Sequence, residues 1–220
     1  MPLGELFDEP EDTRQELMGA TYRALCEHGY AELTIQRISD QFPKSKSLLY
    51  HHYDSKDELL VEFLSFVLDH LESTTPSDDD EPMAAIQGLL DHLLPTEPST
   101  EQQQFMQAII ELRAQAATNP KYRAQFTRST DFFEDQFAAI IERGHKAGVF
   151  QPADADRIAA LVVATVDGAL LQQATTETAQ PTIRELRAEL EIYIERRLGV
   201  DSGATELDTE LTKTDTGAAE

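Results

Sequence analysis

The chain has 220 residues, 41 of them acidic and 18 basic, which gives a formal net charge of −23. Its hydrophobic content of 40% suffices for one large core, or for a small domain joined to a larger one. The acidic excess argues against indiscriminate binding to nucleic acid or anionic membranes, although a specific basic patch is compatible with it.

Apolar residues recur at helical spacing almost throughout, which predicts an all-α fold of about nine helices. The first helix begins at the capping-box pattern Thr13-Arg14-Gln15-Glu16 and runs to Gly29. The second spans residues 34–42 with Thr34 as N-cap, and the third spans residues 44–53. A second capping box, Ser55-Lys56-Asp57-Glu58, starts the fourth.

An acidic segment containing Pro and Ser, residues 72–82, predicts a linker or loop. Beyond it, the predicted helices span residues 83–94, 101–118, 120–147, 153–176 and 181–198. Few bulky apolar residues follow Gly199, so residues 200–220 are expected to form a disordered acidic tail. The predicted domains are therefore residues 1–57 and 58–199, followed by this tail.

The second and third predicted helices have the lengths of a helix-turn-helix unit, whose second helix lies in a DNA major groove. Residues 34–56 carry four basic and two acidic side chains, a net of +2. Residues 61–220, in contrast, carry 12 basic and 29 acidic side chains, a net of −17. Positive charge therefore collects where DNA phosphates would be met.

A set of positions in this region falls in register with a known pattern: Glu27-His28-Gly29-Tyr30, Thr34-Ile35, Ile38, Ser45-Lys46, Leu49-Tyr50, His52-Tyr53 and Lys56. In these residues the chain resembles the tetracycline-repressor-type (TetR) transcriptional regulators. The sequence departs from the pattern at Pro43-Lys44 and Ser47-Leu48, which replace a usual Gly-Val and a common Gly-Thr. Because Pro suits a turn entering a helix, the fold is expected to survive, while the base readout is expected to differ from the family's.

The resemblance implies a recognition helix that presents side chains to the groove, with His52 and Lys56 reaching phosphates. Lys can donate to guanine or phosphate, Ser can serve either base type, and Leu can contact a thymine methyl. For Tyr50 and His51, packing is the alternative to DNA contact. The predicted DNA-binding residues are Thr34, Gln36, Lys44, Ser45, Lys46, Ser47, Leu48, Tyr50, His51, His52 and Lys56.

Aromatic and flexible side chains on the predicted helices 101–118 and 120–147 have two interpretations, core packing and a ligand cavity. The family binds small, usually apolar or aromatic molecules between its fourth and eighth helices, so the resemblance implies a small-molecule effector. The predicted ligand-binding residues are His70, His92, Phe105, Met106, Ile109, Arg113, Phe133, Phe137 and Gln172.

The predicted helix 153–176 is apolar nearly all round, so it must be covered on more than one side. The family pairs its last two helices with their copies in a four-helix bundle, which implies a homodimer on a palindromic site in double-stranded DNA. The predicted interface residues are Val162, Val166, Leu170, Leu186, Leu190 and Tyr193.

Motifs for catalysis or metal binding are absent from the sequence, so we predict no catalytic residue, no metal ligand and no cofactor. The single Cys26, the lack of a signal peptide and the lack of a long enough apolar run predict a cytoplasmic protein without a membrane partner. The predicted function is a ligand-responsive DNA-binding regulator, most simply a repressor. The alternative is an acidic helical ligand-binding protein or enzyme subunit that keeps the fold without operator binding.

Arg outnumbers Lys by 12 to 6 and Trp is absent, a balance that resembles proteins of salt-accumulating halophiles; an acidic mesophilic protein is the alternative. Salt shortens the screening length from about 10 Å at 0.1 M to about 3 Å at 1 M, which weakens the self-repulsion of the acidic chain. We therefore expect the melting temperature to rise between about 0.1 M and about 2 M potassium chloride. Calorimetry checks this, and an unchanged melting temperature would contradict it.

Overall fold

The computed structural model describes residues 3–44, 49, 52–73, 81–177 and 179–200. This part of the chain is helical and contains no strand, which confirms the all-α prediction. The elements are the 3-10 helix η1 (Leu3–Phe7) and the α-helices α1 (Thr13–Glu32), α2 (Ile35–Gln41), α4 (Lys56–Ser73), α5 (Pro82–Leu93), α6 (Thr100–Gln115), α7 (Pro120–Lys146), α8 (Ala155–Thr175) and α9 (Ala179–Leu198).

The described residues thus form eight α-helices, where the sequence predicts about nine. The helix predicted at residues 44–53 falls largely outside the described part, although the Tyr53 amide donates to the Leu49 carbonyl at 3.0 Å, as in a helical turn. All of the predicted tail after Val200 and most of the predicted linker, residues 72–82, also fall outside it. The short η1 was not predicted.

Two helix termini differ from their predicted caps. The N-cap of α1 is Asp12, whose carboxylate accepts from the Gln15 amide at 2.7 Å, and not Thr13. The helix also continues past Gly29, which adopts a left-handed conformation (φ 65°) and kinks it. At α4, the Ser55 hydroxyl caps the Glu58 amide as predicted, but the Glu58 carboxylate accepts from the Asp54 amide.

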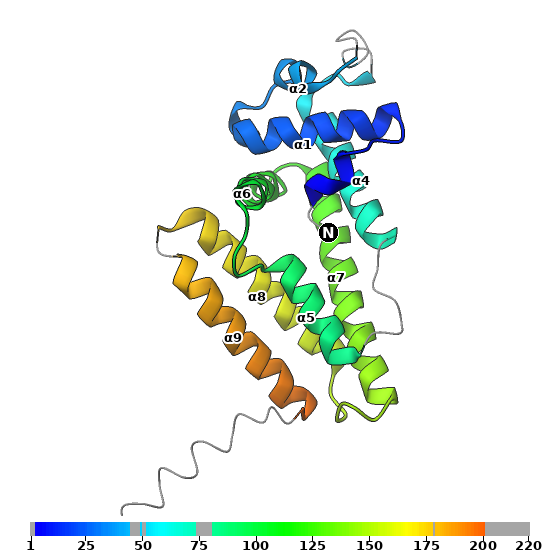
Figure 1. The fold of residues 1–220 in the computed structure, drawn as a ribbon, viewed down its shortest axis with the longest axis vertical. Coiled ribbons are helices and arrows are strands. Elements are labelled where there is room, and N and C mark those ends of the chain that lie inside the picture. Colours follow the sequence, from blue (N-terminus) through cyan, green and yellow to red (C-terminus); the bar gives the residue numbers. More distant parts are fainter. Residues whose placement is uncertain (1–2, 45–48, 50–51, 74–80, 178, 201–220) are drawn as a thin grey trace, which may run out of the picture.

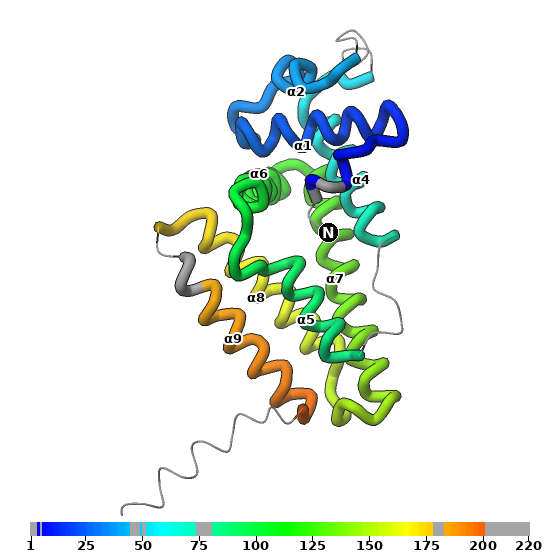
Figure 2. The backbone as a smooth tube through the Cα atoms, in the orientation of Figure 1, coloured from blue at the N-terminus to red at the C-terminus, as the bar shows by residue number. Residues whose placement is uncertain are grey.

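Figure 1 shows α1, α2 and the start of α4 at one end of the molecule, and α5, α8 and α9 at the other. The long α7 runs between the two ends, and α6 is seen nearly end-on between α1 and the lower helices. The backbone trace in Figure 2 shows α9 running alongside α8. The N-terminal unit therefore rests on α6 and on the first turns of α7.

Buried side chains form two core clusters. The first joins η1, α1, α2 and α4 to Leu112 of α6 and to Tyr122 and Phe126 of α7. The second joins α5, the C-terminal half of α7, α8 and α9. The first cluster therefore extends across the predicted boundary between residues 57 and 58.

The end of α7 is closed by a turn around Gly148, which has φ 73°. The Val149 amide donates to the Gly144 carbonyl and the Gly148 amide to the His145 carbonyl, both at 3.0 Å, which is the Schellman pattern of a helix C-terminus. The turn brings the buried ring of Phe150 back over Gly144.

Candidate DNA-binding unit and regulatory cavity

The start of the helix-turn-helix is set locally. The Thr34 hydroxyl accepts from the Arg37 amide at 3.1 Å, as its predicted role of N-cap requires. Ile38 and Phe42 are buried in the first core cluster, and so is Leu49, which anchors the following segment. Hydrophobic anchors on both sides of the turn therefore fix α2 against α1.

The predicted groove-facing residues fall outside the described part of the chain: Ser45, Lys46, Ser47, Leu48, Tyr50 and His51. Of the other predicted DNA contacts, His52 is exposed, and Gln36 donates to the Asp40 carboxylate at 2.8 Å.

Three cations of this unit already have partners within the protein. The Lys44 Nζ lies 2.6 Å from the Thr13 hydroxyl and 2.7 Å from the Glu16 carboxylate. The Arg37 guanidinium donates to the carbonyl and the carboxylate of Glu32 at 2.6 and 3.0 Å. A phosphate approaching Lys44 must therefore compete with an acidic side chain of α1, which the sequence prediction did not foresee.

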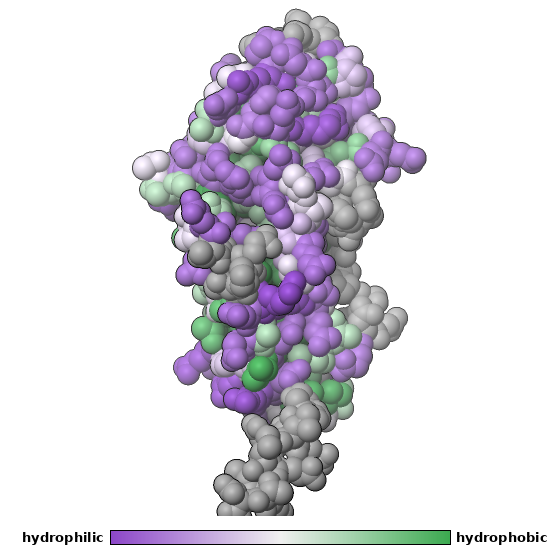
Figure 3. All heavy atoms as spheres, turned by 60° about the vertical axis from the view of Figure 1, so that its left-hand side comes forward, coloured by the Kyte–Doolittle hydropathy of each residue, from purple (hydrophilic) through white to green (hydrophobic). Residues whose placement is uncertain are grey.

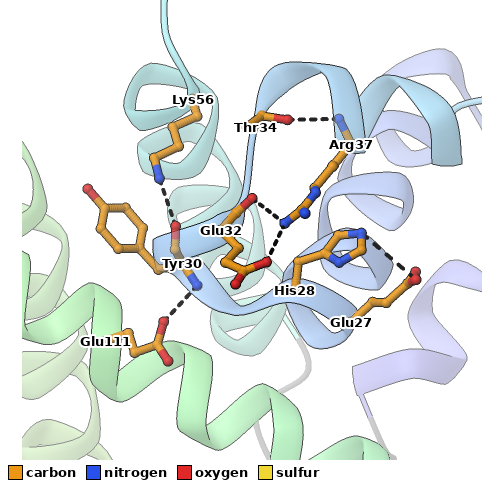
Figure 4. A network of polar contacts seen from close by, with 8 residues as sticks. All are labelled: Glu27, His28, Tyr30, Glu32, Thr34, Arg37, Lys56 and Glu111. Carbon is orange, nitrogen blue, oxygen red and sulfur yellow. Dashed lines mark hydrogen bonds and ion pairs between the residues drawn. The ribbon is translucent and has the colours of Figure 1, made fainter.

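The third cation, Lys56, belongs to a group of side chains around Tyr30 that we call the Tyr30 junction: Tyr30, Lys56, Asp57, Glu111 and Tyr122. The Lys56 Nζ donates to the Tyr30 carbonyl at 2.7 Å and lies 4.1 Å from the centre of the Tyr30 ring. On the other side, the Glu111 carboxylate accepts from the Tyr30 amide at 2.7 Å. Figure 4 shows Tyr30 held between these two side chains.

One carboxylate oxygen of Asp57 joins three helices in this junction. It accepts from the Tyr30 hydroxyl at 3.1 Å and from the Tyr122 hydroxyl at 3.0 Å. Burial, followed by the contact with Asp57, raises the pKa of both phenols above the usual value, so both hydroxyls remain protonated donors at neutral pH. The first turn of α4 is thus bonded to α1 and to α7.

A cavity of about 490 Å³ lies between α4, α5, α6, α7 and α8. Its walls are mostly apolar and include the rings of Phe105, Phe126 and Phe133. The polar side chains in the walls are Asp91, His92, Gln102, Arg113, Gln125, Ser129, Thr130 and Asp167. This size and this lining are typical of a site for a small organic molecule.

Six of the nine residues predicted to bind a ligand line this cavity: His92, Phe105, Met106, Ile109, Arg113 and Phe133. The other three do not. Phe137 is buried in the second core cluster, Gln172 is exposed on the far side of α8, and His70 lies off the α4 face that carries Leu64 and Leu68. These three predicted ligand-binding residues therefore lie outside the cavity walls.

The cavity wall contains an ion pair that the sequence prediction missed. The Arg113 Nη2 donates to the Asp167 carboxylate and lies 3.5 Å from the Thr130 hydroxyl, while its guanidinium carbon is 5.2 Å from the centre of the Phe126 ring. Burial raises the pKa of Asp167 above its usual value, against the opposite effect of Arg113. The presence of Asp167 in the otherwise apolar stretch of α8 was the sequence feature that could have indicated this ion pair.

Two other wall residues add to this polarity. Desolvation lowers the pKa of His92 below its usual value, so its imidazole is neutral at neutral pH. The Gln125 Oε1 is buried and accepts no hydrogen bond from the described residues. The cavity walls therefore carry a neutral imidazole as well as a charged pair.

Comparison with known families supports the helix-turn-helix assignment directly. Residues 17–63 match the family described as "Bacterial regulatory proteins, tetR family", and residues 82–199 match "BetI-type transcriptional repressor, C-terminal". The second match alone spans more than half of the chain. The chain belongs to the TetR family of transcriptional regulators. It is therefore a DNA-binding regulator and not an enzyme, and the alternative of an enzyme subunit is not favoured.

Individual relatives agree with this assignment. The chain is 22% identical over 141 residues to the HTH-type transcriptional repressor AcnR of Corynebacterium efficiens, covering 64% of this chain and 70% of that protein. It is 29% identical over 87 residues to the HTH-type transcriptional regulator TtgR of Pseudomonas putida, covering 38% and 41% of the two chains.

Solved structures extend the likeness to the whole fold. A TetR transcription regulator from Haloarcula marismortui is 33% identical, covers 85% of this chain and 98% of its own, and superposes with a TM-score of 0.73. A transcriptional regulator from a Rhodococcus species is 21% identical, covers 86% and 97%, and has a TM-score of 0.68, which shows the shared fold alone.

TetR regulators act as dimers, and this TetR-family chain leaves apolar side chains uncovered on its last two helices. Leu161 and Leu171 of α8 are 45% and 51% exposed, and Ile192 of α9 is 36% exposed. Gly168 lies on the same face of α8 as these leucines, and a Cβ atom built there meets nothing within 4 Å. Figure 3 shows one face of the molecule, which is mainly hydrophilic around α1 and α2 and has hydrophobic patches nearer the other end.

The TetR-family fold places the predicted interface residues in or against the core of a single protomer. Val162, Val166 and Leu190 are buried in the second core cluster of a single protomer, and Leu170, Leu186 and Tyr193 pack against it. The physical reason is that α8 is apolar on several sides, so the sequence does not reveal which side faces the protomer's own core. The exposed leucines lie on the opposite side of α8.

Among the described residues, one helix, α8, is long and apolar enough to cross a membrane by length and composition. In this TetR-family chain it packs against α7 and α9 and contributes to the second core cluster, as a core helix does. No group of three or more His, Cys, Asp or Glu side chains in the described ranges could hold a metal ion.

Proposed function

We propose that the protein is a homodimeric cytoplasmic repressor that binds a palindromic operator and leaves it when an apolar or aromatic molecule occupies the cavity. The observation that carries this proposal is the cavity of about 490 Å³, because α4 forms one of its walls and also begins at the Tyr30 junction beside the helix-turn-helix. A ligand that moves α4 would change the separation of the two recognition helices in the dimer.

In this proposal, residues 1–57 read DNA and residues 58–199 hold the ligand and the dimer interface. Lys46, Ser47 and Leu48 contact bases, whereas His52 and Lys56 contact phosphates. Lys56 can serve both roles, a structural one and a phosphate contact. Its ammonium group has three N–H donors, and the Tyr30 carbonyl accepts from only one of them. The likeness to the Haloarcula marismortui regulator supports a salt-adapted origin.

The lining of the cavity narrows the ligand class. The aromatic rings favour a flat apolar body, and the Arg113–Asp167 pair in the wall favours a polar group on it. Regulation requires that the ligand bind the DNA-incompetent arrangement more tightly than the competent one. A coupling of about 1 to 3 kcal/mol is enough, and operator DNA must weaken the ligand by the same factor.

Operator binding is tested by selecting the genomic fragments that the purified protein retains at several salt concentrations. A palindromic consensus is expected, with an affinity that falls as salt rises because bound counterions are released. Retention of fragments without any common sequence would refute sequence-specific binding.

Filling the cavity should remove the response to ligand. Gly88 lines the cavity, and a Cβ built there meets nothing within 4 Å, so we expect Gly88→Phe to place its ring in the cavity. In a thermal-shift screen of apolar and aromatic compounds, we expect the wild type to gain several degrees with its ligands and Gly88→Phe to gain none. Operator affinity without ligand should stay within about twofold of the wild type. Equal shifts in both proteins would place the ligand elsewhere.

A further inference from the structure

The chain changes direction between α1 and α2, and the Tyr30 junction is where other helices hold this turn. Gly29 supplies the left-handed conformation, and a Cβ there would lie 3.2 Å from the Glu111 carboxylate. Both backbone groups of Tyr30 are bonded to charged side chains of other helices, the amide to Glu111 and the carbonyl to Lys56. The direction in which α2 leaves α1 thus depends on α6 as well as on α4.

Glu111 also has a particular place on α6. Residues of an α-helix are separated by about 100° around its axis, so Glu111 lies on the side opposite the wall residues Met106, Ile109 and Arg113. The neighbouring Ala108 and Leu112 are buried against the N-terminal unit in the first core cluster. A single helix therefore separates the cavity from the turn between α1 and α2.

We propose that Glu111 is a positioning residue for operator binding. By accepting a hydrogen bond from the Tyr30 amide, it holds α2 in the DNA-competent orientation. This assigns to α6 a second connection between cavity and helix-turn-helix, beside the connection through α4. The role in ligand response rests on the proposed repressor function, whereas the bond to Tyr30 can be examined without DNA.

The electrostatic and the positioning explanations predict opposite changes in operator affinity for Glu111→Ala. Loss of a negative charge by itself strengthens binding to DNA, so a purely electrostatic effect makes both Glu111→Ala and Glu111→Gln bind more tightly. The Gln side chain of Glu111→Gln keeps an oxygen that can accept a hydrogen bond from the Tyr30 amide, whereas the Ala side chain of Glu111→Ala has none. Positioning therefore predicts that Glu111→Ala binds the selected operator about tenfold more weakly, while Glu111→Gln stays within about twofold of the wild type.

The matched control is Glu142→Ala, which removes the same charge from the exposed Glu142–Lys146 pair on α7. It should not weaken operator binding. Affinities are measured well below each variant's melting temperature, so that unfolding does not contribute. Equal affinities of Glu111→Ala and Glu111→Gln would overturn the proposal.

Hydrogen exchange of the Tyr30 amide gives the readout that is independent of DNA. The amide should exchange slowly in the wild type and in Glu111→Gln, and at least about tenfold faster in Glu111→Ala. Equal exchange in all three proteins would overturn the proposal even if operator affinity changed. Failure of the wild type to select any operator would instead refute the repressor function, and the exchange experiment would still decide the role of Glu111.

Discussion

Replacing Gly144 with alanine is expected to lower the free energy of unfolding by about 3 kcal/mol. A Cβ at this position would lie 2.1 Å from the Phe150 ring, far inside van der Waals contact. Phe150 is only 3% exposed and its backbone is fixed by the turn at Gly148, so the ring has little room to move. Denaturant unfolding followed by circular dichroism measures the change.

Gly88→Ala is the matched control for this prediction. Gly88 also lies inside a helix, but a Cβ there meets nothing within 4 Å. Because alanine is the better helix former, this variant should be more stable than the wild type by about 0.5 to 1 kcal/mol. A loss of stability in Gly88→Ala similar to that in Gly144→Ala would show that packing against Phe150 is not the cause.

Leu171→Glu is expected to raise the dissociation constant of the dimer by about two orders of magnitude or more. The two-fold axis of a dimer brings the same surface of both protomers together, so the substitution would bury two like charges. Leu171 is 51% exposed in the protomer, so the substitution should leave the helical fold of the protomer intact. Light scattering at micromolar concentration should show a monomer that no longer binds the palindromic operator.

The control for the interface is Ala124→Glu, which adds the same charge at an exposed position of α7. This variant should remain dimeric, because its charge lies outside α8 and α9. If Leu171→Glu also remains dimeric, the outward face of α8 is not the interface. A monomeric wild type would refute the dimer itself.

Features fixed by short sequence separations could be predicted from the sequence. Thr34 is an N-cap because its hydroxyl meets the amide three residues later, and the breakers Pro120 and Pro152 fall at helix boundaries. The motif from Glu27 to Lys56 predicted the family, which the comparisons confirm. The partner of Lys44 could not be predicted, because Glu16 comes close only when α1 packs beside the turn.

Helical periodicity predicts which side of a helix is apolar but not what covers that side. Phe133 and Phe137 lie on one face of α7, yet Phe133 lines the cavity and Phe137 fills the second core cluster. The difference arises because Phe137 packs among buried residues of α5 and α8, which α7 alone does not reveal. The same limit explains the interface residues, since α8 presents apolar side chains to the core and to solvent alike.

The first core cluster has a consequence for hybrid regulators. Tyr122 and Phe126 of α7, with Leu112 of α6, complete the interior of the DNA-reading end. A chimera joined near residue 57 would separate those three side chains from their partners and leave both halves with uncovered apolar surface. The whole N-terminal unit is therefore compatible only with a regulatory half whose α6 and α7 side chains fit it. Changes in the recognition helix alone are for this reason an easier evolutionary route to a new operator specificity than transplanting the whole unit.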